Sequence, residues 1–432
     1  MENDFVNTLS HKERKRYHIY ALASTWFGCF SDVMIDSSAI LILYFAMLGA
    51  SDSETMFTTA FVSIASMLFM IPASGLVNKL GAKSVVAISS FIGTSACLLM
   101  AIAPIFGTSY GCFVALSGCF IYSISKATWP VAWYVVLGNI LLPKERGNFL
   151  GFMRFSYYIL TGITFWIIGH YMGKNPPILF LQVVIAIIGI MVLGRTFFIS
   201  MIKLPEQVSG RLDFAKSFKS VVRNTPLVGF AAYVGFICLA FAAVLPLTLL
   251  YLKSGLNLPE GLVQEISAVG IGGLVLGFFV YGRLVKLIGI KNVQIIVHLI
   301  YIITPLCLFF CSKEVPYVEW IAGAFYVLGS FGFACFYCYM SQEILALSRP
   351  SNLSMASAFV QTYQFIGTTC SRGAISFLIG SGMLASSWTK WGINFTHFQT
   401  LFLISSAIAV FCLIMVFCLP SVIKDKEDYY NP

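Results

Sequence analysis

Long apolar stretches alternate with short polar turns along the whole chain. A helix that crosses a lipid bilayer needs about 20 mostly apolar residues, and twelve stretches reach that length. They cover approximately residues 20–48, 54–77, 82–103, 109–141, 149–172, 177–201, 226–252, 262–288, 292–311, 318–347, 353–381 and 397–419. The pattern predicts an all-α integral membrane protein with twelve transmembrane helices and almost no residues left for a soluble domain.

The composition supports this class. Hydrophobic residues make up 58% of the 432 residues and charged residues only 10%, whereas charged residues are about 25% of soluble domains. The polar, basic start of the chain leads directly into a full-length apolar stretch without a visible cleavage site. We therefore expect the first helix itself to act as the insertion signal.

The net charge of +9 is informative through its distribution. Of the 27 Lys and Arg residues, nineteen fall in turns on one side of the predicted membrane and four on the other. The remaining four lie within or at the ends of apolar stretches, namely Lys126, Arg154, Arg195 and Arg372. Because Lys and Arg are in excess in cytoplasmic loops, we expect both termini in the cytoplasm of a cell (inner) membrane. That arrangement requires an even number of spans, in agreement with twelve.

An internal repeat relates the two halves of the chain. The segment from Gly75 to Lys83 recurs from Gly282 to Lys291, and Pro143 recurs as Pro350, always 207 or 208 residues later. The offset predicts an N-terminal six-helix bundle (1–201), a basic cytoplasmic linker (202–225) and a C-terminal six-helix bundle with a short cytoplasmic tail (226–432). Such a parallel repeat is typical of one class of secondary transporters.

The sequence resembles the major facilitator superfamily over essentially its whole length. The family's signature in the loop between helices 2 and 3 corresponds here to Gly75, Asn78, Lys79, Gly81 and Lys83, with Asn78 in place of the usual aspartate. The stretch from Pro143 to Gly147 is also similar to the family's next cytoplasmic loop. The resemblance implies two six-helix bundles with pseudo-two-fold symmetry and a gating role for the first loop, in which the Asn78 amide can still cap a helix end.

Two carboxylates, Asp32 and Asp36, interrupt the first apolar stretch. A charged Asp at the centre of a membrane helix costs roughly 2.5 to 3.5 kcal/mol, so such acids are candidates for a functional site. Their spacing places both on one helical face, and we expect Lys126 of the fourth stretch to face one of them, since a buried ammonium also needs a partner. The pair either holds two helices together or exchanges a coupling ion. Two acids for one lysine favour the exchange, because one carboxylate then takes H⁺ or Na⁺ from outside.

Three aromatic residues, Tyr122, Trp129 and Trp133, flank Lys126 at helical spacing. Aromatic stripes of this kind are usually packing, but beside a lysine they can also form a sugar-stacking platform or a cation–π box. In the family that the sequence resembles, helices 1, 4, 7 and 10 line the central cavity. Carried over, this implies a substrate path lined by the stripe and by Tyr233, Phe236, Tyr326, Ser330 and Tyr337.

A second polar stripe follows the eleventh stretch, through Gln361, Gln364, Thr368 and Arg372. Arg372 lies about eight residues from the outer end, too deep for easy snorkelling. Its guanidinium can bind a carboxylate or phosphate of a substrate, or it can pair with helix 7 or 8 as a gate. We include Gln361, Gln364 and Arg372 in the candidate substrate-binding set, whereas Arg154 and Arg195 are interpreted as snorkelling or inner-gate residues near the cytoplasmic side.

Other chemistries find little support in the sequence. The chain has no Gly-rich phosphate loop and no Ser-His-Asp set, and its five histidines are scattered. The twelve cysteines lie nearly all within the apolar stretches and are interpreted as packing. We therefore expect neither an enzyme nor a metal or other cofactor, apart from a coupling H⁺ or Na⁺. Helix 5 also lacks the Gly-Pro kink that drug antiporters of the resembling family carry, which disfavours drug efflux.

These observations predict a secondary transporter that works by alternating access. We expect cation-coupled symport, with H⁺ as the first candidate, of a small polar organic solute such as a sugar, and an organic anion is the second candidate. An uncoupled facilitator or exchanger, a receptor and a membrane-embedded enzyme are the alternatives. The expected partners are a small-molecule substrate and the lipid bilayer, without nucleic acid, and the expected state is a monomer.

Overall fold

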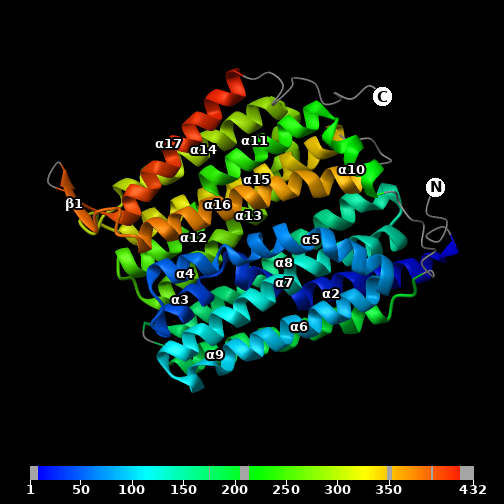
Figure 1. The fold of residues 1–432 in the computed structure, drawn as a ribbon, viewed down its shortest axis with the longest axis horizontal. Coiled ribbons are helices and arrows are strands. Elements are labelled where there is room, and N and C mark those ends of the chain that lie inside the picture. The colour runs from blue at the N-terminus through cyan, green and yellow to red at the C-terminus, as the bar shows by residue number, and fades with distance from the viewer. Residues whose placement is uncertain (1–7, 175, 205–213, 348–352, 391–392, 419–432) are drawn as a thin grey trace. The chain divides into compact units, whose positions relative to one another are not determined.

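The computed structural model describes residues 8–174, 176–204, 214–347, 353–390 and 393–418. Helices make up nearly all of this part (Figure 1). They are α2 (His11–Ser37), α3 (Ala39–Met47), α4 (Asp52–Thr58), α5 (Phe61–Leu80), α6 (Ala82–Ile102), the 3₁₀ helix η1 (Ala103–Phe106), α7 (Thr108–Ile140), α8 (Pro143–Met172), α9 (Ile178–Ser200), α10 (Phe214–Val222), α11 (Thr225–Phe241), α12 (Val244–Leu250), the π-helix η2 (Tyr251–Gly255), α13 (Glu260–Ile288), α14 (Ile290–Phe310), α15 (Val318–Leu347), α16 (Leu353–Gly380) and α17 (His397–Cys418). A hairpin of β1 (Ser387–Lys390) and β2 (Ile393–Thr396) precedes α17.

All twelve predicted stretches are helical. Within the described residues, nine helical spans are long and apolar enough to cross a membrane, and the bent pair α2 and α3 makes a tenth. The other two stretches form α8 and α16, which are more polar but contain 30 and 28 residues. At about 1.5 Å per residue, both exceed the thickness of the hydrocarbon core. The structure is therefore that of a multi-pass membrane protein.

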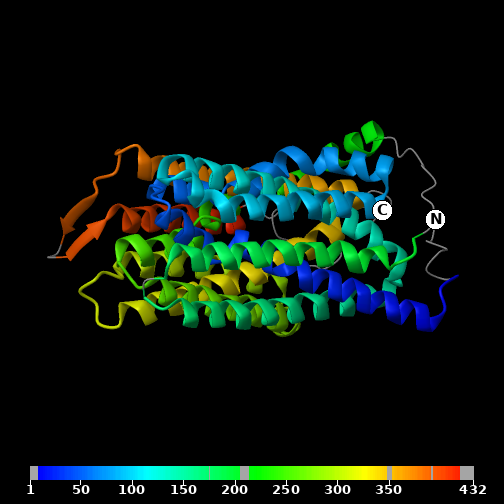
Figure 2. The same ribbon diagram turned by 90° about the horizontal axis from the view of Figure 1, so that it is seen from below.

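The chain divides into two compact units. The first contains Met1–Ala50, Ile64–Thr164 and Pro176–Gly210. In it, α6 packs against both α7 and α9, and α9 packs against α2 (Figures 1 and 2). A hydrophobic cluster that includes Tyr17, Val77, Trp133 and Ile199 joins α2, α5, α7 and α9. This packing brings the first, fourth and sixth predicted spans together.

The second unit contains Ser51–Ser63, Phe165–Asn175 and Arg211–Pro432. Its main helix pairs are α13 with α15, α11 with α16 and α14 with α17, and α4 packs against α16. It thus includes two short pieces from the N-terminal half of the sequence, α4 and the last turns of α8. The Gly261 amide donates to the Gly173 carbonyl at 2.8 Å, which fastens the end of α8 to the start of α13.

Interruptions occur in three membrane spans of the described part of the chain. The first bends by 56° between α2 and α3, where the Ser38 hydroxyl accepts from the Ile40 amide at 3.0 Å and caps the new helix. The second is interrupted between α4 and α5, and the seventh between α11 and α12. Interrupted spans leave backbone carbonyls that the helix itself does not satisfy. Such carbonyls can accept from side chains of neighbouring helices.

The sequence repeat corresponds to two turns of the same backbone conformation. Gly81 joins α5 to α6 with φ 83°, and Gly289 joins α13 to α14 with φ 79°. Each glycine donates its amide to the residue four before it at 2.9 Å and accepts from the residue four after it at 3.2 Å. This left-handed conformation is open to glycine at little cost. The backbone conformation of the turn therefore explains why both copies of the repeat have a glycine at this position.

Candidate coupling site

Asp32 of α2 lies in a closed hydrogen-bonded group. Its Oδ2 accepts from Arg195 Nη2 of α9 at 2.6 Å, and its Oδ1 accepts from the Tyr122 hydroxyl of α7 at 3.1 Å. The side chain of Arg195 is only 2% exposed and that of Asp32 is 19% exposed. Three membrane helices therefore meet at one carboxylate, and both of its oxygens have partners in the chain.

The local sequence of α2 makes room for Arg195. A Cβ atom at Gly28, one turn before Asp32, would overlap the Arg195 guanidinium, and one at Gly194 would overlap the ring of Phe27. One turn before Gly28, the Ser24 hydroxyl donates to the Arg195 carbonyl at 3.2 Å. Positions 24, 28 and 32 thus form a seam on one helical face. Along this seam α9 comes close enough for its arginine to reach the acid.

The ring of Trp129 covers the other side of the guanidinium. The Arg195 Cζ lies 3.8 Å from the centre of that ring, which is cation–π geometry. The Arg195 Nε has no hydrogen-bond partner among the described residues. The arginine is thus enclosed by a carboxylate, an aromatic face and a glycine, in a position from which it does not reach water.

Asp36, one turn after Asp32, has a different environment. It forms an ion pair with Lys126, whose side chain is 13% exposed, while the side chain of Asp36 is 44% exposed. Lys126 Nζ also donates to the backbone carbonyl of Asp32 at 2.6 Å. The pair lies beside the bend between α2 and α3. Asp36 therefore combines a cationic partner with access to solvent.

Two sequence-based interpretations need correction. The expectation that Lys126 faces one of the acids is confirmed, but the premise of two acids for one lysine is wrong, because Arg195 pairs with Asp32 and Lys126 pairs with Asp36. The interpretation of Arg195 as a snorkelling residue is also wrong, because its side chain is buried and pairs with Asp32, whereas the inner-gate alternative stays a prediction. A signal existed in the sequence, since Gly28 lies on the same face as Asp32 and Gly194 adjoins Arg195. Which helix faces α2 was not visible from the sequence.

The other candidate residues of the first unit are also accounted for. Trp133 is 3% exposed and belongs to the hydrophobic cluster, and its ring lies 5.9 Å from that of Trp129. Its position agrees with the packing alternative for the aromatic stripe. In the loop signature, Lys83 Nζ donates to the Ser200 carbonyl at 3.1 Å. Gly75 and Lys79 belong to α5, whereas the side chain of Asn78, residues 205–213 of the linker and residues 419–432 of the C-terminal tail lie outside the described part of the chain.

In the second unit, Tyr233 takes part in a buried polar network. Gln294 Nε2 donates to the Tyr233 hydroxyl at 2.7 Å, and that hydroxyl lies 3.0 Å from His298 Nε2. His298 Nδ1 lies 2.8 Å from the Gln294 carbonyl, so it is the protonated nitrogen and Nε2 of a neutral ring accepts from Tyr233. The network joins α11 to α14. Tyr233 is only 1% exposed, and these contacts bind its hydroxyl.

The polar stripe of α16 separates into three local contacts. Gln364 Nε2 donates to the Tyr337 hydroxyl at 2.9 Å, and Gln361 Nε2 donates to Ser357 at 2.8 Å. Arg372 Nε donates to the Ala242 carbonyl at 3.2 Å, and its Nη1 donates to the Thr59 carbonyl. The substrate roles of these residues remain predictions. The contacts of Arg372 agree with the gate alternative more than with substrate binding.

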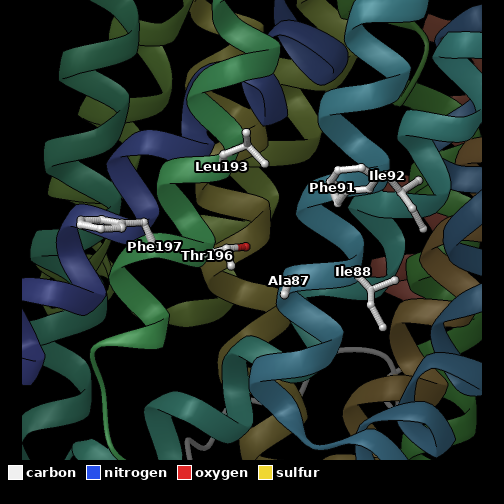
Figure 3. Close-up of a pocket in the computed structure, with 7 residues that line it drawn as sticks. All are labelled: Ala87, Ile88, Phe91, Ile92, Leu193, Thr196 and Phe197. Carbon is white, nitrogen blue, oxygen red and sulfur yellow. The ribbon is translucent and has the colours of Figure 1, made fainter.

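An open groove on the first unit has neither acid in its lining. It runs between α6 and α9 and is lined by Ala87, Ile88, Phe91, Ile92, Leu193, Thr196 and Phe197 (Figure 3). All but Thr196 are apolar, and Phe91 is 68% exposed. No residue of the candidate site lines this groove. Among the described residues, no group of His, Cys, Asp and Glu side chains has the arrangement of a metal site.

Long apolar helices with ion pairs between them define a multi-pass membrane protein. The family model of the Major Facilitator Superfamily matches residues 24–371. The chain belongs to the major facilitator superfamily, and its fold is the twelve-helix fold of that family. The predicted fold class and the family resemblance are confirmed.

Solved structures of transporters share this fold at low sequence identity. A mutant of the nucleoside transporter NupG has a TM-score of 0.73 and 15% identity, over 94% of this chain and 99% of that one. A D-xylose-proton symporter has a TM-score of 0.72 and 13% identity, over 98% and 100%. A bacterial homologue of the iron transporter ferroportin, in an inward-facing state, has a TM-score of 0.68 and 12% identity, over 96% and 100%. A search of curated proteins finds no match.

Proposed function

We propose that this transporter is a cation-coupled symporter, with H⁺ as the coupling ion, of a small hydroxyl-rich solute such as a sugar or a nucleoside. In this proposal Asp36 is the carboxylate that gains and loses the proton, and Lys126 is its exchangeable partner. Asp32 and Arg195 hold α2, α7 and α9 in place around them. Access to the two sides of the membrane alternates by movement of the two six-helix halves, 1–201 and 226–432.

The difference in exposure between the two acids carries the proposal. A coupling carboxylate must exchange protons with water and must have a partner that takes its place when the proton binds. Asp36 is 44% exposed and pairs with a lysine that has a second acceptor, the Asp32 carbonyl. When Asp36 is protonated, the Lys126 ammonium keeps that carbonyl as a partner. Asp32 lacks this freedom, because a buried guanidinium and a tyrosine occupy both of its oxygens.

Two observations support a hydroxyl-rich solute over an organic anion. The neighbours in fold include a nucleoside transporter and a D-xylose-proton symporter, and amides such as Gln361 and Gln364 suit hydroxyl groups. The second observation is that helix-embedded bases already bind acceptors of this chain. Lys126 and Arg195 bind acids, and Arg372 binds two carbonyls.

Uptake into proteoliposomes tests both parts of the proposal. We expect D-xylose or uridine to accumulate above its external concentration when the outside is more acidic, and a protonophore to reduce uptake to equilibration. A Na⁺ gradient at equal pH serves as the second arm, and lactate serves as the organic-anion probe. Uptake of a sugar or nucleoside that reaches equilibrium at the same rate with and without either gradient would identify a facilitator and overturn the coupling assignment.

The orientation and assembly belong to the same proposal. Both termini and the linker at 202–225 lie in the cytoplasm, in a cell (inner) membrane, and the transporter works as a monomer. The positive charge of the turns on one side supports this orientation. Labelling of single cysteines placed in the turns at 79–83 and 312–317, with a membrane-impermeant reagent on intact cells, tests it. The 312–317 turn is expected to react from outside and the 79–83 turn only after permeabilisation.

A further inference from the structure

Arg372 lies where two interrupted membrane spans end. Its Nε donates to the carbonyl of Ala242, the residue that caps the end of α11. Its Nη1 donates to the carbonyl of Thr59, which caps the end of α4. One side chain from α16 therefore binds the backbone of the second and seventh spans, which are 183 residues apart in the sequence (242 minus 59).

The Ala242 carbonyl is open because of the sequence of α12. In a continuous helix this oxygen would accept from the amide of the residue four positions later, and that residue is Pro246, which has no N–H. The next carbonyl, of Ala243, accepts normally from the Leu247 amide at 2.9 Å. The Arg372 Nε thus supplies the donor that Pro246 removes.

The Thr59 carbonyl is open for a different reason. The span is interrupted between α4 and α5, and neighbouring hydroxyls already bind other carbonyls there. Thr58 donates to Thr55 at 2.8 Å, Thr59 to Met56 at 2.7 Å, and Ser63 to Ala60 at 2.8 Å. Arg372 binds the carbonyl of Thr59 itself. Helix C-terminal carbonyls carry partial negative charge, so two such ends at one point attract a cation.

We propose that the Ala242 and Thr59 carbonyls form a cation site that Arg372 fills from within the chain, and that the emptied site binds a free guanidinium ion. The occupant is planar and donates in two directions, which an ammonium or a metal ion does less well. Within membrane-spanning segments water does not readily replace these donors. Arg372 is therefore a positioning residue that joins the second, seventh and eleventh spans, and it acts on the fold independently of the proposed substrate and coupling ion.

Other contacts of α16 near Arg372 support this role. Thr369, one turn before Arg372, donates to Ser63 at 3.0 Å, and Ser376, one turn after it, donates to the Ser53 carbonyl at 2.9 Å. Small residues also bring α11 close to α16, since a Cβ at Gly367 would overlap the Gly235 carbonyl. The second span and α11 thus both pack against α16 near Arg372, which is the charged residue among these contacts.

Chemical rescue tests the site on purified protein. We expect Arg372→Ala to lower the apparent Tm by several degrees, and low-millimolar guanidinium chloride to recover a large part of the loss, with NaCl as the salt control. Arg283→Ala is the matched control, because Arg283 lies over the Phe279 ring at 4.9 Å and its loss opens no carbonyl site. An equal response of both variants to guanidinium would overturn the proposal.

A double-mutant cycle tests the cause assigned to Pro246. Pro246→Ala restores a backbone donor for the Ala242 carbonyl, so we expect Arg372→Ala to cost clearly less in that background than alone. Pro305→Ala in α14 is the control and should leave the cost unchanged. Fully additive losses with Pro246→Ala would overturn the assignment. If Arg372→Ala does not yield folded protein, Arg372→Lys serves in the double-mutant cycle, which does not require an emptied site, and neither readout requires transport to occur.

Discussion

Asp32 and Asp36 are one turn apart on the same helix, yet they lie in two different kinds of site. Arg195, Tyr122 and the ring of Trp129 enclose the region around Asp32, whereas Asp36 pairs with Lys126 beside a helix bend and remains 44% exposed. The same carboxylate group therefore forms a largely enclosed ion pair at Asp32 and an accessible ion pair at Asp36. The difference teaches that an intramembrane acid is not by itself a coupling site, and that its partner and its access to water decide the role.

Removal of Arg195 should have the largest effect, because it leaves a carboxylate without its cation. We expect Arg195→Ala to destabilise the protein by about 3–5 kcal/mol, the cost of breaking a buried ion pair from one side. The measurement is the apparent Tm of the detergent-purified protein. The double variant Asp32→Asn with Arg195→Ala should recover part of the loss, since no unpaired charge remains. A double variant less stable than Arg195→Ala alone would contradict the stabilising role of the Asp32–Arg195 ion pair.

Gly28→Ala should have an intermediate effect. The added methyl group would overlap the Arg195 guanidinium, so either the arginine or α9 must shift, at about 1–3 kcal/mol. The control is Gly151→Ala in α8, where a Cβ meets no atom within 4 Å and the better helix propensity of alanine favours the variant. Thermal unfolding of the two variants compares them directly. Equal stability of Gly28→Ala and the unmodified protein would show that the seam is looser than the contacts indicate.

Asp36→Asn should have the smallest effect on stability and the clearest effect on transport. Asp36 is 44% exposed, and the Lys126 ammonium keeps the Asp32 carbonyl as an acceptor in the variant, so the apparent Tm should fall less than for Arg195→Ala. Accumulation of solute under a proton gradient should be lost, while exchange of labelled for unlabelled solute continues, because exchange needs no change in protonation. Asp52→Asn is the control, as Asp52 accepts from Ser254 at 2.7 Å and takes no part in the pair. Normal accumulation by Asp36→Asn would assign coupling to another group.

Much of the fold was predictable because it depends on local pattern. Long apolar stretches form helices in lipid whatever they later contact, and every one of the twelve is helical in the structure. The repeat of the segment from Gly75 to Lys83 was also visible in the sequence, and its glycines Gly81 and Gly289 take the left-handed conformation in both turns. Lys126 was expected to face one of the acids for a general energetic reason, and it pairs with Asp36.

The partner of Asp32 was not predictable in the same way. Arg195 is 163 residues away in the sequence, and its depth depends on how α9 lies along the seam of Ser24, Gly28 and Asp32. The role of Arg372 was left open for a similar reason. A guanidinium can bind a substrate anion or a backbone carbonyl, and only the neighbouring helix ends distinguish the two. Pro246 marked the open carbonyl in the sequence, but nothing local connected it with residue 372.

The sequence by itself determined that this protein crosses the membrane many times, that its halves repeat and that it places two acids on one face of its first helix. These properties follow from the cost of exposing polar groups to lipid and from helical periodicity. Only the tertiary structure decided which acid is enclosed, which is accessible, and which carbonyls Arg372 binds. The reason is physical, because contacts between helices depend on which faces meet. Small residues such as Gly28 permit a close approach of another helix but do not determine which helix approaches.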